Sequence, residues 1–120
     1  MKYQLSKHKE LWDGIIGYLK SKDFSMGFKP FHTLYTGYCI SVGLRYESYA
    51  CEYAVSKAPY TYYMAHCKYC PAELCVVHKC GTDCLYMKVV HAYSNRDKVN
   101  AVKYAKLIRD IPVKEGVEVE

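Results

Sequence analysis

The spacing of the cysteines constrains this chain more than any other feature of its sequence. Six of the seven cysteines lie between Cys51 and Cys84, and Cys67 and Cys70 form a Cys-x-x-Cys pair that Pro71 follows directly. Two thiolates at this spacing can reach one metal ion, and structural Zn²⁺ sites commonly take their ligands from two short pairs. The pattern therefore predicts a zinc ion that holds the middle of the chain together.

Whether clustered thiols bind metal or form disulfides depends on the compartment in which the chain resides. Residues 1–10 lack the apolar core of a signal peptide, and no stretch approaches the roughly 18 consecutive apolar residues of a membrane span. We therefore expect a reducing cytoplasm and no membrane contact. In that compartment disulfides are rare and clustered cysteines more often bind metal. Disulfides and reduced core cysteines are the alternatives.

The residues that would complete the zinc site are less narrowly specified than the first pair. Cys80 and Cys84, which three residues separate, could supply a second pair, and Cys51 and Cys75 are alternatives. Cys39 lies further upstream and reads as a buried helical cysteine.

Histidines beside the cluster raise the question of a catalytic zinc. His66 and His78 could replace a thiolate, although a histidine beside a Cys-rich loop more often supports a ligand or faces solvent. Zinc deaminases carry His-x-Glu ahead of Pro-Cys-x-x-Cys, whereas here Pro71 follows the pair. The chain also has no Walker loop and no Gly-x-Gly-x-x-Gly motif. We therefore assign no catalytic residue and favour a non-enzymatic protein.

Hydrophobic spacing predicts about three helices. The first is expected over residues 6–21, and the second over residues 38–57 with Cys51 facing inward near its end. The first helix places these apolar residues on one face: Leu11, Trp12, Ile15, Ile16 and Leu19. The second does the same for a mixed set: Ile40, Leu44, Glu47, Cys51 and Val55.

The third helix is expected to begin after a cap within residues 94–97 and to end at Asp110, before Pro112. Its apolar residues are Val99, Val102, Tyr104, Ala105, Leu107 and Ile108. Residues 85–91 read as a short strand or the start of a helix, and residues 114–120 are expected to fray. The predicted fold is thus a small metal-stabilised α or α+β domain. It has about three helices around a Cys-rich zinc loop and little sheet. We expect residues 1–120 to form a single zinc-stapled domain.

The charge and the tyrosines permit two kinds of partner. A formal net charge of +5 is mild, and the seventeen lysines and arginines are spread along the chain. Such a balance allows nucleic-acid contact but is equally what solubility requires. Tyr can stack on bases, yet it more often fills a small core, so we assign most of the fourteen tyrosines to packing.

Four short motifs occur in a characteristic order along the chain. Together they resemble a loose group of small cysteine-containing proteins encoded by tailed bacteriophages. The motifs are His-Lys-Glu-Leu-Trp-Asp at 8–13, Cys-Glu-Tyr-Ala at 51–54, Cys-Lys-Tyr-Cys-Pro at 67–71 and Tyr-Ala-Lys-Leu-Ile-Arg-Asp-Ile-Pro at 104–112. The cysteine that often stands three residues before the Cys-Glu-Tyr-Ala motif is replaced here by Ser48.

The resemblance implies a ligand set and an origin. It implies that zinc is bound by Cys51, Cys67, Cys70 and Cys84, with Cys80 in reserve. It also implies a phage protein that resides in the host cytoplasm.

Two hypotheses of function follow. The first is a phage accessory protein that binds a host protein, such as a defence nuclease, and acts as a counter-defence inhibitor. The second is a zinc-stabilised nucleic-acid-binding module, although weak nucleic-acid binding is compatible with the first. They are distinguished by whether a set of lysines converges on one face with exposed tyrosines: Lys20, Lys22, Lys57, Lys68, Lys79 and Lys88.

Overall fold

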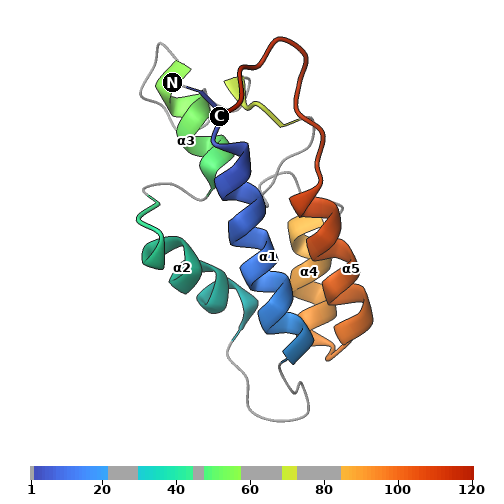
Figure 1. Ribbon diagram of the computed structural model, residues 1–120. Coiled ribbons are helices and arrows are strands. Elements are labelled where there is room, and N and C mark those ends of the chain that lie inside the picture. Colours follow the sequence, from blue (N-terminus) through green and yellow to red (C-terminus); the bar gives the residue numbers. More distant parts are fainter. Residues whose placement is uncertain (1, 22–29, 45–47, 58–68, 73–84) are drawn as a thin grey trace.

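A computed structural model gives the structure of this protein for residues 2–21, 30–44, 48–57, 69–72 and 85–120. These segments contain five helices: α1 (Leu5–Ser21), α2 (Phe31–Ser41), α3 (Tyr49–Lys57), α4 (Leu85–Ser94) and α5 (Lys98–Arg109). Figure 1 shows α1 in the centre, with α4 and α5 on one side and α2 and α3 on the other. No helix in these segments combines the length and the apolar character that a membrane span requires.

Helix α1 forms as its hydrophobic spacing predicts. The side chains that it buries are His8, Leu11, Trp12, Ile15, Ile16 and Leu19. All five apolar residues assigned to its inner face are therefore confirmed. Burying a large apolar side chain stabilises a fold by about 1.5–3 kcal/mol, so this face holds α1 in place despite two glycines in its sequence.

The prediction of one helix over residues 38–57 is wrong, because the chain breaks between α2 and α3. Gly43 adopts a positive φ of 77°, a conformation that glycine reaches without steric cost. Its amide donates to the carbonyl of Ile40, and the amide of Leu44 donates to that of Cys39, both at 3.0 Å. This pair of bonds is a Schellman motif and ends α2.

Helix α3 then begins at its own cap. The hydroxyl of Ser48 accepts a hydrogen bond from the amide of Cys51 at 3.0 Å, which satisfies a donor that the first turn leaves without a helical partner. Because α2 and α3 are separate, Ile40 does not share a face with Cys51. Ile40 is instead 71% exposed.

Helices α4 and α5 form a tight antiparallel hairpin. The amides of Arg96 and Asp97 donate to the carbonyls of Tyr93 and Ala92, so a second Schellman motif ends α4 with Arg96 at a φ of 59°. The carboxylate of Asp97 accepts from the amide of Asn100 at 3.1 Å and caps α5. The predicted cap within residues 94–97 is therefore confirmed, and residues 85–91 are helical.

The core is aromatic and lies where α1, α2 and α4 meet. The ring centroids of Trp12 and Tyr35 are 5.4 Å apart, and those of Tyr35 and Tyr86 are 5.3 Å apart. Phe31 contacts Tyr86 and Tyr93 edge to face at 5.7 and 5.6 Å. Aromatic pairs at these separations contribute about 0.5–1.5 kcal/mol each beyond the area that they bury. Tyrosines thus serve the core, as the sequence indicated.

The predicted arrangement of about three helices around a Cys-rich zinc loop is wrong. The described residues contain five helices and no strand, and they pack on one another through aromatic and aliphatic side chains. Cysteine spacing suggested a metal-centred core, but the large side chains of α1, α2 and α4 already supply enough apolar surface to fold around. Most of residues 67–84 lies outside the described segments.

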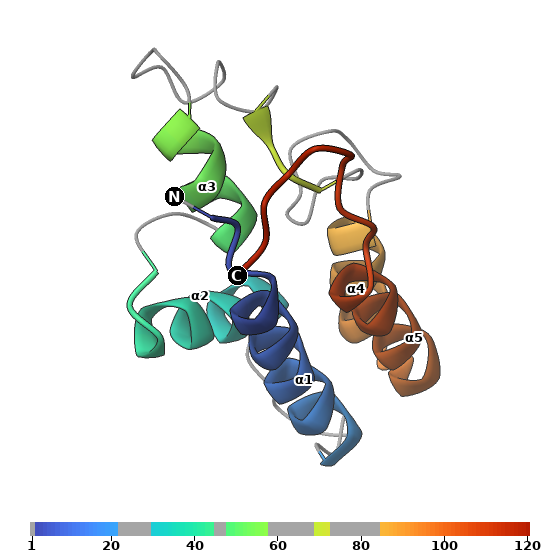
Figure 2. The same cartoon turned by 45° about the horizontal axis from the view of Figure 1, so that its top comes forward.

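The C-terminal tail is ordered rather than frayed. The amide of Tyr3 donates to the carbonyl of Glu118, and the amide of Glu120 donates to that of Tyr3, both at 2.9 Å. Further back, the amide of Lys114 donates to the carbonyl of Pro71 at 2.7 Å. Figure 2 shows the tail crossing from α5 past residues 69–72 to the N-terminus. Backbone hydrogen bonds of this kind cannot be predicted from the spacing of apolar side chains.

His8 connects the start of α1 to the end of α5. Its imidazole is 1% exposed, and its Nε2–H donates to the carbonyl of Ile108 at 3.1 Å. Nδ1 is buried with no hydrogen-bond partner among the described residues. Burial lowers the pKa of His8, and Lys9 lowers it further, whereas the backbone carbonyls of Ile108 and Arg109 and the charge of Asp110 oppose this. Neutral His8 is therefore the form that the fold accommodates.

Acidification should destabilise the protein through His8. Between the ordinary pKa of 6.5 and the lower folded value, the unfolded chain binds a proton that the folded chain does not, so stability falls as the pH falls. One such group contributes at most about 1.4 kcal/mol per pH unit. Urea titrations from about pH 7.5 to about pH 5 should show a smaller loss in His8→Gln than in the wild type. The exposed His91 provides the control, and equal losses in His8→Gln and His91→Gln would contradict this role.

Candidate functional site

The structure describes two of the five predicted zinc ligands. Cys51 lies on α3, Cys70 lies in the segment 69–72, and both are half-buried. The remaining predicted ligands, Cys67, Cys80 and Cys84, lie outside the described residues, as do the alternatives Cys75, His66 and His78.

Cys51 and Cys70 share a neighbour although they are distant in the sequence. Burial raises the pKa of Tyr3, and negative charge on the thiolates of Cys70 and Cys51 raises it further. Both sulfur atoms therefore lie close enough to one phenol to act on it electrostatically. Backbone bonds that hold the tail to Tyr3 and to Pro71 bring these two segments together.

Cys39 is a buried helical residue, as predicted. It lies on α2 with 7% of its surface exposed. Its thiol hydrogen-bonds the phenol of Tyr35 and, after burial, is the main cause of the raised pKa of Tyr35. Tyr35 is also influenced by Cys51, so the three described cysteines surround two core tyrosines.

The described residues do not form a complete metal centre. No group of three or more histidines, cysteines, aspartates or glutamates gathers within them. Cys51 and Cys70 thus provide two ligands at most, and a tetrahedral site would need two more from elsewhere in the chain.

Residues 8–10 read His-Lys-Glu, which matches the His-x-Glu spacing of zinc deaminases. His8 is not available for such a role because its Nε2 is bonded to the carbonyl of Ile108 in the interior. Its position is explained by packing between α1 and α5, and Glu10 is exposed. No deaminase-like site arises from this motif.

A different candidate site lies on the α4–α5 hairpin. Residues 85–109 contain six basic residues and one acidic residue, so this segment carries a formal charge of +5. This value equals the formal charge of the whole chain, which means that the remaining residues balance. The only carboxylate in the segment, that of Asp97, is hydrogen-bonded to Asn100 at the start of α5.

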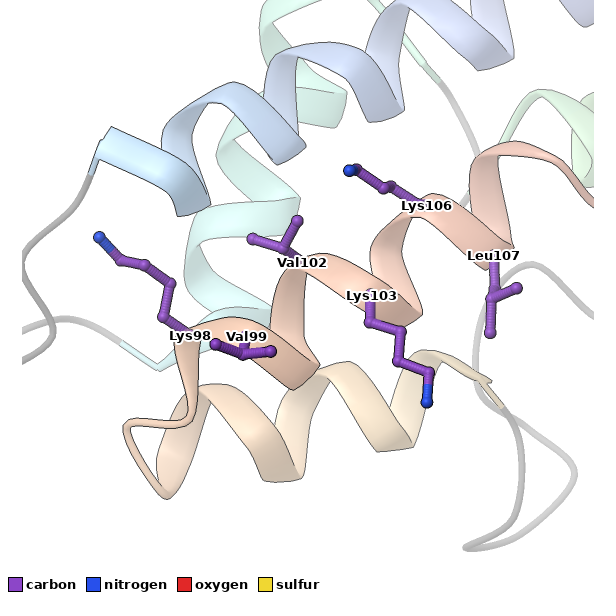
Figure 3. A pocket seen from close by; sticks show the side chains of 6 residues that line it. All are labelled: Lys98, Val99, Val102, Lys103, Lys106 and Leu107. Atoms are coloured by element: carbon purple, nitrogen blue, oxygen red, sulfur yellow. The ribbon is translucent and has the colours of Figure 1, made fainter.

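Helix α5 has one face that the rest of the described fold leaves uncovered. It packs against α4 and α1 through Ala101, Ala105 and Ile108, which are fully buried. Val99 and Leu107, by contrast, are 79% and 47% exposed. A shallow groove of about 590 Å³ lies on this side. Figure 3 shows the six side chains that line it: Lys98, Val99, Val102, Lys103, Lys106 and Leu107. We call these six residues the α5 groove.

Two lysines of the α5 groove, Lys103 and Lys106, keep their positive charge available. Among the described residues, no carboxylate lies within salt-bridge distance of Lys103 or Lys106. Lys98 donates from Nζ to the carbonyl of Lys20 at 2.9 Å and so contacts the end of α1. Arg109 differs, because it pairs with Asp13 at 2.8 Å and with Asp110 at 3.0 Å.

Tyr104 lies beside the α5 groove between two lysines. The Nζ atoms of Lys88 and Lys103 are 5.6 and 5.7 Å from the centroid of its half-buried ring. These cation–π contacts place one further charge, that of Lys88, near the same surface as Lys103. The basic face therefore spans both helices of the hairpin.

Six lysines were expected to distinguish the two hypotheses of function. Three of them lie outside the described residues: Lys22, Lys68 and Lys79. Lys57 lies on α3, against Tyr53, and does not belong to the α4–α5 hairpin. Sequence inspection missed the lysines of α5, although the near-absence of acidic residues over 85–109 was a usable signal.

Comparisons with protein-family models, with curated proteins and with solved structures found no match for this chain. The resemblance to phage proteins therefore stays a prediction.

The α5 groove should be dispensable for folding. Leu107→Ala is expected to change the free energy of unfolding by no more than about 0.5 kcal/mol, because the side chain is half-exposed. Ile108→Ala, one residue further along, should cost about 2–5 kcal/mol, because it leaves a cavity between α5 and α1. Urea denaturation measures both. Equal losses in the two variants would mean that Leu107 supports the core.

Proposed function

We propose that this protein is a non-enzymatic bacteriophage accessory protein that binds a protein of the host cell. The observation that carries this proposal is the α5 groove, where exposed aliphatic side chains lie beside Lys103 and Lys106, which have no carboxylate partner among the described residues. The phage origin rests on the motifs at 8–13, 51–54, 67–71 and 104–112.

A protein target suits this surface better than nucleic acid. Val99 and Leu107 gain free energy only when a partner covers them, at about 25 cal/mol per Å² of apolar area. A phosphate backbone offers little apolar surface, whereas protein interfaces combine an apolar centre with a polar rim. A defence nuclease is a suitable target, because carboxylates that hold catalytic metal ions give such enzymes an acidic site.

The proposal is tested by capture and titration. Immobilised protein is expected to retain a specific host protein from a nuclease-treated bacterial lysate at about 200 mM salt. Titration of the purified partner should then give a defined stoichiometry. An unrelated protein of matched charge is the control. If no host protein is retained above that control, the proposal fails.

Nucleic-acid binding is the alternative, and one observation favours it. Tyr104 lies between Lys88 and Lys103, an arrangement in which a ring and two cations could contact a base and its phosphates. The number of phosphates that this face can neutralise is small, however, and affinity from such contacts falls steeply with salt.

Duplex DNA should therefore bind weakly and without sequence preference. A gel-shift titration at about 50 mM and about 200 mM salt is expected to show binding that nearly disappears at the higher concentration. Tight binding that survives the higher salt and prefers one sequence would favour the nucleic-acid alternative.

We also propose that the protein binds one zinc ion through cysteine thiolates. Cys51 and Cys70 are the described ligands, and Cys67 with Cys84 or Cys80 would complete the set that the motifs imply. The proposal is supported by the Cys-x-x-Cys-Pro sequence at 67–71 and by the backbone hydrogen bonds through which the tail contacts both Pro71 and Tyr3. Bound zinc would join α3 to the segment 69–72 and stabilise both.

Elemental analysis after reducing purification should find about one zinc per chain. Cys51→Ser is expected to lower the zinc content and the melting temperature, because metal binding contributes to folding free energy. Cys39→Ser is the matched control and should keep its zinc. Less than about a tenth of an equivalent in the wild type, or loss of zinc in Cys39→Ser alone, would contradict the proposal.

A further inference from the structure

We infer that the α5 groove binds an acidic amphipathic helix that belongs to the partner protein. This inference rests on the proposed function and adds to it the surface that is used and the chemistry of the segment that is recognised.

The shape of the site favours a helix lying along α5. Val99 and Leu107 are separated by eight residues, which corresponds to about 12 Å along a helix axis. Val102 lies between them and is half-buried. In Figure 3, Lys98, Val102 and Lys106 lie on the side of α1, whereas Lys103 and Leu107 lie on the other side. A partner helix of two to three turns with apolar residues at i, i+3, i+4 and i+7 would cover this stripe.

The positive charge of the groove favours a partner helix that is negatively charged. Lys103 and Lys106 lie between Val102 and Leu107 around the helix, so positive charge stands among the aliphatic side chains. Helices α4 and α5 contain no acidic residue. Glutamates beside the apolar residues of a partner helix would meet these lysines, and like charges would be excluded. The remaining residues of the chain sum to no net charge, so the net attraction for an acidic helix comes from this hairpin.

The exposed aliphatic side chains of the groove favour an acidic helix over other anionic ligands. A nucleic acid would use the lysines and Tyr104 but would leave Val99 and Leu107 uncovered. An anionic membrane would use both kinds of residue, yet three lysines and two fully available aliphatic side chains give only marginal attachment. A helix that offers carboxylates and leucines together uses every residue of the groove.

The probe is a synthetic helical peptide of about 16 residues, with leucines at one helical face and glutamates elsewhere. Its control is a peptide of the same composition in which the leucines are dispersed around the helix. Fluorescence anisotropy at about 150 mM salt should show saturable binding of the first peptide and at least about tenfold weaker binding of the second.

Two variants of the protein assign the binding to the groove. Lys103→Glu with Lys106→Glu, and separately Val99→Ala with Leu107→Ala, should each weaken peptide binding about tenfold, as loss of interface anchors does. Lys2→Glu with Lys57→Glu reverses the same charge at exposed positions outside the hairpin and should stay within about twofold of the wild type. Circular dichroism melts confirm that each variant is folded.

Several results would overturn the inference. Equal affinity for the two peptides, or wild-type affinity in the Val99 and Leu107 variant, would show that the groove does not recognise the apolar face of a helix. Tighter binding of duplex DNA or of phosphatidylglycerol vesicles than of the peptide, lost in the same variants, would assign the groove to that ligand instead. If the groove variants still retain the host protein that the wild type captures, the inference fails while the proposed function stands. If the wild type captures none, the proposed function fails.

Discussion

The structure depends on the close approach of α5 to α4 and α1. Ala101, Ala105 and Ile108 are fully buried on the inner side of α5, and the two alanines let its backbone lie near its neighbours. His8 connects this contact to the start of α1 through the carbonyl of Ile108. The aromatic core between α1, α2 and α4 completes the packing, so α5 is supported along its length and its outer side is left to solvent.

That support has a functional consequence. A rigid helix whose inner side satisfies the fold can present an outer side that the fold does not need, and such a surface is suited to recognition. On α5 the outer side combines exposed aliphatic side chains with Lys103 and Lys106, which no described carboxylate neutralises. Arg109, the last residue of the same helix, is instead paired with Asp13 and Asp110. Charge and apolar exposure therefore coincide on one helix.

The elements that could be predicted were those whose signals are local. The apolar period of α1 and the acid at Asp97 are each contained within a few residues, and both were read correctly. The break between α2 and α3 was also local, at Gly43 and Ser48, but an apparent apolar face across the break outweighed these two signals. The pairing of the tail with Tyr3 could not be found, because it consists of backbone hydrogen bonds between opposite ends of the chain.

By itself the sequence determined where α1 and α5 form and that a cysteine pair suited to metal is present, because helical periodicity and ligand spacing are properties of neighbouring residues. Only the tertiary structure decided which side of α5 is buried, since Val99 and Leu107 look as apolar in the sequence as Ile108 does. It also decided that the tail pairs with Tyr3 at one end of the chain and with Pro71, next to Cys70, in the middle. Both outcomes depend on how separate elements pack, and packing is set by the shapes of all partners together rather than by any one segment.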